Sequence, residues 1–172
     1  SSSCGLCGKA SIDNIQRQFD RIRSPIRITP EILLGLSERM RTRQSAFDAT
    51  GGIHAAALFD AKGELLVLRE DVGRHNAVDK VLGHAFLQGW IPLADKMLLV
   101  SGRASFEIVQ KALAGGIPIV CAISAPSTLA VDLAQSSGIT LVGFLRENRF
   151  NIYSQPRRIA TGSAARSKIR LP

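Results

Sequence analysis

The sequence predicts an α/β protein, a three-layer α/β/α sandwich built on a mixed, mostly parallel sheet of about five strands. Residues 64–145 alternate three times between a short apolar run and an amphipathic run, with short polar loops between them. Strand–helix–strand repeats with short links form parallel sheets with right-handed crossovers. Residues 53–59 and 64–69 flank the turn-forming run Asp60-Ala61-Lys62-Gly63, which predicts a hairpin and one antiparallel strand.

The first predicted helix begins at Thr29, because Thr-Pro-Glu supplies an N-cap residue, a proline at the first helical position and an acid in the first turn. Its apolar residues keep helical spacing as far as Phe47, and Gly51-Gly52 ends it. The later strands are predicted at about residues 64–70, 97–100, 117–123, 140–145 and, as a short edge piece, 150–153. The helices that follow the first three of these strands are predicted at about residues 75–87, 105–114 and 127–136.

The length of 172 residues suits a single domain with its own core. We expect residues 1–28 to form a mobile loop and lead-in, residues 29–155 a single α/β/α domain, and residues 156–172 a basic C-terminal tail. The tail is basic because no acidic residue follows Glu147. The chain has no starting Met, so we expect a piece of a longer protein.

The net charge is +8, from 22 Lys and Arg against 14 Asp and Glu, and this favours anionic partners. Trp90 and Tyr153 are the only Trp and Tyr, so a stacking platform for single-stranded nucleic acid is poorly supplied. The chain has no apolar run of roughly 18 residues, the length that a membrane-spanning helix needs. Three cysteines are an odd number, which argues for a reducing compartment and against a disulfide framework. We therefore predict a cytoplasmic protein with no nucleic-acid and no membrane partner.

Three polar loops follow predicted strands, at residues 71–76, 101–105 and 124–128. Ligands of open α/β sheets bind beyond the carboxyl ends of the strands, and each loop opens a helix whose N-terminus favours an anion. The candidate binding residues in these loops are Gly73, Arg74, His75, Ser101, Arg103 and Ser124. The two arginines are suited to bidentate contacts with phosphate, so we predict a phosphate-bearing ligand. The alternative is that the loop serines only cap helices. Neither a P-loop nor GxGxxG is present.

Two histidines have candidate roles near this ligand. His75 and Asp79 stand one helical turn apart, which is compatible with an oriented imidazole near the ligand or with a histidine tied to its own i+4 carboxylate. His54 begins a predicted strand and could face the same crevice.

Cys4 and Cys7 form a CxxC framed by glycines and followed by Lys9, whereas Cys121 lies in an apolar strand and is expected to be buried. A zinc site would need a second pair of ligands at suitable spacing. A dithiol oxidoreductase is a second possibility for CxxC. The third is a sulfur carrier, in which a mobile, electropositive loop lowers the thiol pKa and a second cysteine resolves or protects the persulfide. These residues alone leave the carrier and the oxidoreductase both open.

Six sequence blocks, in order and spanning about residues 4–158, resemble the formate dehydrogenase accessory sulfurtransferase (FdhD) family. They are Cys4-Gly-Leu-Cys7-Gly8, Thr50-Gly51-Gly52-Ile53-His54-Ala55-Ala56, Glu70-Asp71-Val72-Gly73-Arg74-His75-Asn76-Ala77-Val78-Asp79-Lys80, Ser101-Gly102-Arg103-Ala104-Ser105-Phe106-Glu107, Ser124-Ala125-Pro126 and Gly143-Phe144 to Tyr153. The block from Glu70 to Lys80 is the most specific. Family members extend further before the CxxC, so this chain resembles their C-terminal part.

The resemblance implies a cytidine-deaminase-like fold and a sulfurtransferase that accepts sulfur as a persulfide from a cysteine desulfurase. The acceptor would be the molybdenum cofactor, bis(molybdopterin guanine dinucleotide), or its tungsten equivalent, before insertion into formate dehydrogenase. Cys4 would carry the persulfide with Cys7 as its helper. The segment implied to contact the cofactor comprises Phe144, Leu145, Arg146, Glu147, Asn148 and Arg149.

A guanine nucleotide such as GDP is expected to mimic part of this cofactor, and we expect a homodimer. No protein-ligated metal is predicted, because the zinc signature H-x-E…P-C-x-x-C of deaminases is absent. Two alternatives are a non-catalytic cofactor-binding chaperone and a dithiol oxidoreductase that uses the CxxC.

Overall fold

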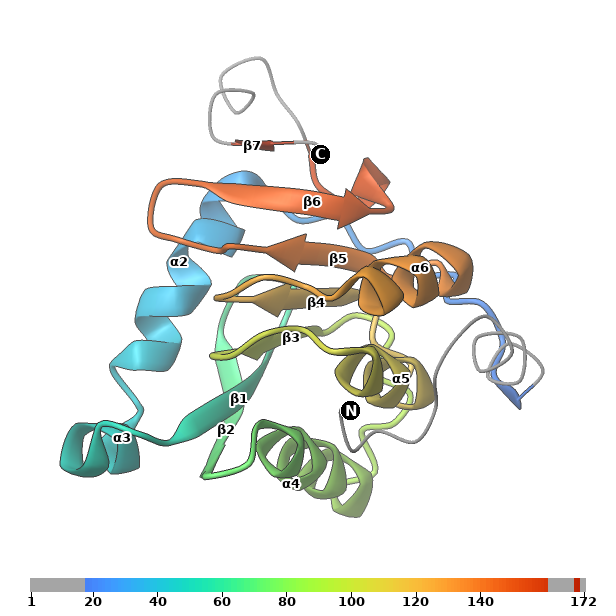
Figure 1. Ribbon diagram of the computed structural model, residues 1–172. Helices are drawn as coiled ribbons and strands as arrows, with labels where there is room; N and C mark the ends of the chain where they lie inside the picture. The colour runs from blue at the N-terminus through green and yellow to red at the C-terminus, as the bar shows by residue number, and fades with distance from the viewer. Residues whose placement is uncertain (1–17, 161–168, 171–172) are drawn as a thin grey trace.

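The computed structural model describes residues 18–160 and 169–170 and shows a three-layer α/β/α sandwich, which confirms the predicted fold class (Figure 1). Its central sheet has seven strands, which are, in spatial order, β2 (Leu65–Asp71), β1 (His54–Phe59), β3 (Met97–Val100), β4 (Ile119–Ala122), β5 (Thr140–Gly143), β6 (Phe150–Ser154) and β7 (Ile169–Arg170). The predicted count of about five was therefore low. Three of the six neighbouring pairs are antiparallel, so the sheet is mixed but not mostly parallel.

The two faces of the sheet carry separate cores because side chains alternate along each strand. Leu98 and Val120 face the helices α4 (Arg74–Leu87), α5 (Phe106–Ala114) and α6 (Thr128–Ser137). Leu99 and Cys121 face the helix α2 (Pro30–Arg41) on the opposite side (Figure 1). Cys121 is fully buried as predicted, and burial raises the pKa of its thiol to about 12. None of the helices in these ranges has the length and apolar character that a bilayer span requires.

The helix predicted from Thr29 to Phe47 is interrupted in the structure. α2 ends at Arg41, and a second helix, α3 (Ser45–Thr50), begins after a tight turn. In this turn the amide of Gln44 donates to the carbonyl of Arg41. The Glu70 carboxylate of β2 accepts hydrogen bonds from the amides of Ala46 and Phe47, both at 2.9 Å, and so fixes the start of α3. This long-range cap explains why the chain leaves the axis of α2.

Residues on either side of the predicted bounds 29 and 155 contact each other. Ile28 and Ile159 form a parallel bridge and are both buried. Arg158, in the short helix η1 (Pro156–Arg158), is fully buried, so the expectation that residue 156 begins a separate basic tail is wrong for this residue. Its guanidinium donates to the carbonyls of Gly138 and Ile22 and to the Thr140 hydroxyl.

Candidate functional site

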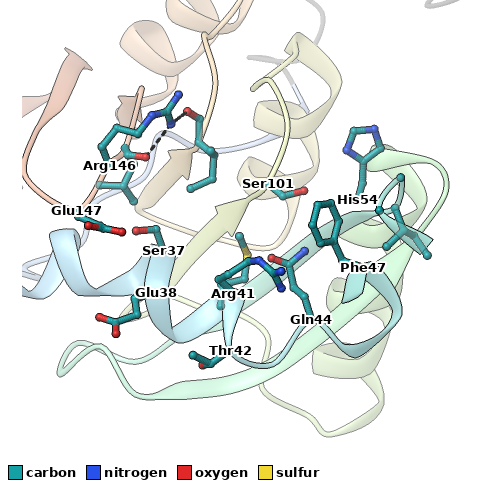
Figure 2. A pocket seen from close by; sticks show the side chains of 16 residues that line it. Ser37, Glu38, Arg41, Thr42, Gln44, Phe47, His54, Ser101, Arg146 and Glu147 are labelled. Atoms are coloured by element: carbon teal, nitrogen blue, oxygen red, sulfur yellow. Dashed lines mark hydrogen bonds between the residues drawn. The ribbon is translucent and has the colours of Figure 1, made fainter. Parts of the chain in front are cut away.

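A cavity of about 650 Å³ lies where the carboxyl ends of β3, β4 and β5 meet the first residues of β1 (Figure 2). The strand ends contribute His54, Ser101, Ile123, Leu145 and Arg146 to its wall. The Ser101 hydroxyl accepts a hydrogen bond from the Ala55 amide at 2.8 Å, which joins the ends of β3 and β1. The cavity therefore occupies the edge of the sheet at which the sequence predicts a ligand.

The opposite wall of this cavity comes from α2, α3 and the turn between them, and it was not predicted as part of the site. Ser37, Glu38 and Arg41 belong to α2, whereas Gln44 and Phe47 lie at the start of α3 (Figure 2). Arg41 is paired with Asp48 at 2.6 Å, and its guanidinium carbon lies 4.8 Å from the centroid of the Phe47 ring. The sequence signal for this wall was a set of polar residues, Ser37, Glu38 and Arg41, beside the apolar face of the helix predicted from Thr29.

The segment Phe144–Arg149, which the family resemblance singles out, lies partly in the cavity. Leu145, Arg146 and Glu147 line it, whereas Phe144, Asn148 and Arg149 are exposed and do not. The Arg146 guanidinium donates to the carbonyls of Ile123 and Leu145, which fixes its stem against the end of β4.

Phe144 has a positive φ of 50°, a conformation that is costly for a non-glycine residue and is enriched at functional sites. Its amide donates to the carbonyl of Ser124, and the Leu145 amide donates to that of Ala122. The preceding Gly143 leaves no room for a side chain, because an added Cβ would lie 2.8 Å from Pro126 and 2.9 Å from Tyr153. Close backbone approach therefore positions the start of this segment.

His54, which lines the cavity, and Arg74, which does not, flank Gly102. An added Cβ on Gly102 would lie 3.4 Å from His54 Nδ1 and 3.7 Å from Arg74 Cδ. Within the described ranges, neither side chain has a hydrogen bond or an ion pair, and Arg74 Nε is buried without a partner. A buried donor without an acceptor is costly, so the pair is suited to an anionic ligand.

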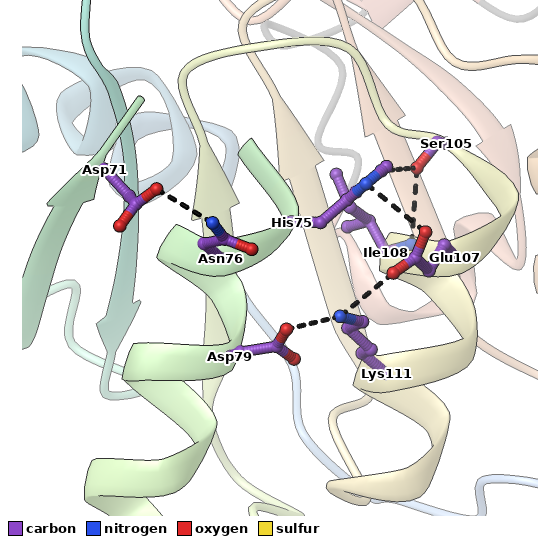
Figure 3. A network of polar contacts seen from close by, with 8 residues as sticks. All are labelled: Asp71, His75, Asn76, Asp79, Ser105, Glu107, Ile108 and Lys111. Carbon is purple, nitrogen blue, oxygen red and sulfur yellow. Dashed lines mark hydrogen bonds and ion pairs between the residues drawn. The ribbon is translucent and has the colours of Figure 1, made fainter. Parts of the chain in front are cut away.

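His75 does not line this cavity, and its side chain points toward α5 (Figure 3). Its Nε2 lies 2.9 Å from the Ser105 hydroxyl, and its Nδ1 lies 3.2 Å from the Glu107 carboxylate. Asp79, the expected partner of His75, instead pairs with Lys111 at 2.6 Å. The predicted pair between His75 and Asp79 is therefore absent, because α5 supplies the partners that the sequence places far away, whereas the role of His75 near the ligand stays a prediction. Glu107 also pairs with Lys111, which lies one helical turn further along α5, at 3.0 Å.

The remaining loop residues have mixed roles. Gly73 is the N-cap of α4, and its amide donates to the Asp71 carboxylate at 2.9 Å. Arg103 is exposed and Ser124 half-buried, and neither lines the cavity. Ser105 caps the N-terminus of α5, and Ser127 caps that of α6. The alternative role of the serines as helix caps is therefore confirmed for these two residues.

Cys4 and Cys7 lie outside the described residues. Between residues 18 and 160 and at 169–170, no group of three or more His, Cys, Asp or Glu side chains is arranged to hold a metal ion. The absence of a protein-ligated metal stays a prediction for the chain as a whole.

The model of the FdhD/NarQ family matches residues 1–160. The chain is 57% identical over 167 residues to the sulfur carrier protein FdhD of Streptomyces avermitilis, a match that covers 95% of this chain and 59% of that protein. It is 51% identical over 159 residues to the sulfur carrier protein FdhD of Picrophilus torridus, covering 92% of this chain and 61% of that protein. The chain thus spans about three fifths of the length of these curated relatives.

Solved structures agree with this match. A crystal structure assigned as a formate dehydrogenase accessory protein from Desulfotalea psychrophila has a TM-score of 0.76 and 32% identity, covering 85% of this chain and 62% of that chain. Guanine deaminase from Nitrosomonas europaea has a TM-score of 0.51 and 16% identity, covering 86% of this chain and 91% of that chain. At that identity the likeness concerns the fold alone, and it agrees with the expected cytidine-deaminase-like architecture.

Proposed function

The chain belongs to the FdhD/NarQ family, and on that premise we propose that it carries the sulfur-transfer and cofactor-binding part of a sulfurtransferase. In this proposal it accepts sulfur from a cysteine desulfurase as a persulfide and passes it to bis(molybdopterin guanine dinucleotide) for formate dehydrogenase. The observation that supports this proposal most is the cavity at the carboxyl ends of β3–β5. The same chain also contains the CxxC motif of the family.

The first transfer is a thiol exchange without net oxidation. The Cys4 thiolate attacks the terminal sulfur of the desulfurase persulfide, the donor S–S bond breaks, and the donor cysteine leaves as a thiolate. Delivery of the carried sulfur as sulfide then needs two electrons. The Cys7 thiolate supplies them by attacking Cys4 Sγ, so that a Cys4–Cys7 disulfide forms as sulfide departs to the metal, and a cellular dithiol reduces the disulfide.

The cavity is of the size typical for small-ligand sites, so it suits one arm of the dinucleotide cofactor rather than the whole molecule. His54, Arg74 and Arg146 give that region positive or hydrogen-bond-donating character, which suits the pyrophosphate of the arm. GDP is the expected soluble mimic. We further propose the desulfurase and the catalytic subunit of formate dehydrogenase as partners, a homodimeric assembly and a cytoplasmic location.

Transfer of labelled sulfur tests the carrier role. The chain is incubated with a cysteine desulfurase and ³⁵S-cysteine, and protein-bound label is measured without reductant. Cys4→Ala should lose the label, whereas Cys121→Ala is a matched control that should keep it, because the buried Cys121 thiol is protonated at neutral pH. Equal labelling of Cys4→Ala and the parent would show that Cys4 is not the carrier.

The same variants separate the alternatives. A chaperone without sulfur chemistry would restore formate dehydrogenase activity with both Cys4 and Cys7 replaced. A dithiol oxidoreductase would show a defined dithiol potential and no persulfide mass shift. Either result would replace the carrier proposal.

A further inference from the structure

Gln44 lines the cavity and is only 4% exposed, yet its side-chain amide has no hydrogen-bond partner among residues 18–160 and 169–170 (Figure 2). Its backbone is engaged, since its amide donates to the Arg41 carbonyl and its carbonyl accepts from the Asp48 amide. Among the described residues, the fully buried side-chain atoms without a partner are Arg74 Nε, Ser137 Oγ and Arg158 Nε. The amide atoms of Gln44 are not among them, so this amide is accessible from the cavity that it lines.

The position of Gln44 on α3 explains why its amide is free. Gln44 is the N-cap residue of α3, and its side chain makes no capping hydrogen bond. The Glu70 carboxylate caps that helix instead, by accepting from the amides of Ala46 and Phe47. Glu70 therefore satisfies the helix terminus and leaves the Gln44 amide available to the cavity.

The cavity wall around this amide is suited to a neutral, flat group. The Phe47 ring and the buried Met40 lie on the same wall. The charge of Arg41 is already paired with Asp48. His54 and Arg146 belong to the strand side of the cavity, and among the described residues neither has an acidic partner, so an anion is better placed there.

We propose that Gln44 is a specificity-determining residue that binds a heterocyclic ring through the edge of a lactam. Its Nε2–H would donate to the ring carbonyl, and its Oε1 would accept from the adjacent ring N–H, which is a two-bond pair between amides. Guanine and the pterin both carry such an edge, so the choice of ring rests on the proposed function. The observation that the Gln44 side-chain amide has no hydrogen-bond partner among the described residues does not depend on the proposed function.

Ligand binding and thermal stability of two variants test this inference. Gln44→Met has a similar length and no amide, and Gln44→Leu is a second apolar variant. Affinities for GDP and for a soluble pterin, pterin-6-carboxylate, are measured by calorimetry on the 172-residue chain. Loss of a buried two-bond pair predicts at least tenfold weaker binding of one or both ligands. The melting temperature without ligand should not fall, because the amide has no partner to lose. Gln88→Met, at an exposed position beyond α4, is the matched control.

The two ligands distinguish the two rings. A loss for GDP alone assigns Gln44 to guanine, and a loss for the pterin alone assigns it to the pterin. Parental affinity for both ligands in both variants would overturn the inference while leaving the proposed function in place. A parent chain that binds neither ligand would overturn the cofactor site and this inference together.

Discussion

The side chain of His75, in α4, contacts Ser105 and Glu107 at the start of the neighbouring helix α5, and not Asp79 of its own helix. The neutral imidazole matches its surroundings, since Nδ1–H can donate to Glu107 and Nε2 can accept from the Ser105 hydroxyl. Burial lowers the pKa of His75, and the Glu107 carboxylate opposes this, whereas the Arg74 and Lys111 charges add to the lowering. The side chain therefore joins α4 to α5 in its uncharged state.

The lowered pKa of His75 predicts that the protein loses stability as the pH falls through the ordinary histidine range. The unfolded chain binds a proton near pH 6.5, before the folded chain does, so protonation favours unfolding below that pH. Urea unfolding between pH 7.5 and about 5.5 should show this decline in the free energy of unfolding. The variant His75→Gln, which cannot titrate, should show a smaller decline. An identical pH dependence in both proteins would contradict the assignment.

The sequence predicts local residue roles better than distant ones. Burial of Cys121 follows from its apolar strand, and the pair between Glu107 and Lys111 follows from helical spacing. The partners of His75 could not be predicted, because Ser105 lies 30 residues away and reaches it only when α4 and α5 dock. Residue patterns predict contacts within one helix or strand, whereas contacts between elements depend on how the elements pack.

At the scale of elements, α3 is the part of the cavity wall that packing holds in place most weakly. It has six residues, none of them buried. Short helices are marginal without tertiary contacts, so the two hydrogen bonds to Glu70 are its main anchor. The predicted single helix fails here because this anchor comes from β2, beyond the reach of local periodicity. The strands at the carboxyl edge were predictable from their apolar runs, and with them the place of Ser101, whereas Arg146 was implied by the family resemblance.

Weakening that anchor should loosen α3. Glu70→Gln replaces one acceptor oxygen by a donor and removes the charge at the helix N-terminus. Amide hydrogen exchange over residues 45–51 should accelerate roughly tenfold, the equivalent of about 1.4 kcal/mol for a lost charge-assisted bond. Glu64→Gln is the control, because Glu64 is exposed and lies 3.6 Å from Arg39. Unchanged exchange in Glu70→Gln would assign the stability of α3 to other contacts.

At the scale of the whole molecule, Arg158 connects segments that are far apart in the sequence. It joins Ile22 near the first described residues, Gly138 at the end of α6 and Thr140 in β5. Burial lowers the pKa of its guanidinium to about 10. Arginines are rarely buried, so the sequence alone gives no sign that this one is. The carbonyls that accept its hydrogen bonds come together only in the complete fold.

Replacing Arg158 should therefore destabilise the whole domain. Arg158→Met fills similar space but removes the donor from two buried acceptors, on Gly138 and Thr140, and from the half-buried Ile22 carbonyl, which predicts a loss of about 3 kcal/mol or more in the free energy of unfolding. The exposed neighbour variant Arg157→Met should change it by less than about 0.5 kcal/mol. Urea denaturation of both variants measures the difference. A similar small effect in both would mean that the buried guanidinium contributes little net stability.

The residues that line the cavity come from two stretches of the chain, residues 37–54 and residues 101–147. During synthesis the helical wall and His54 leave the ribosome first, and the strand wall is complete only when Glu147 has emerged. A nascent chain arrested before that point cannot hold the ligand in this cavity. Binding of a ligand in this cavity therefore requires a chain in which β3, β4 and β5 have already assembled, so the ligand cannot act as a template for the early steps of folding.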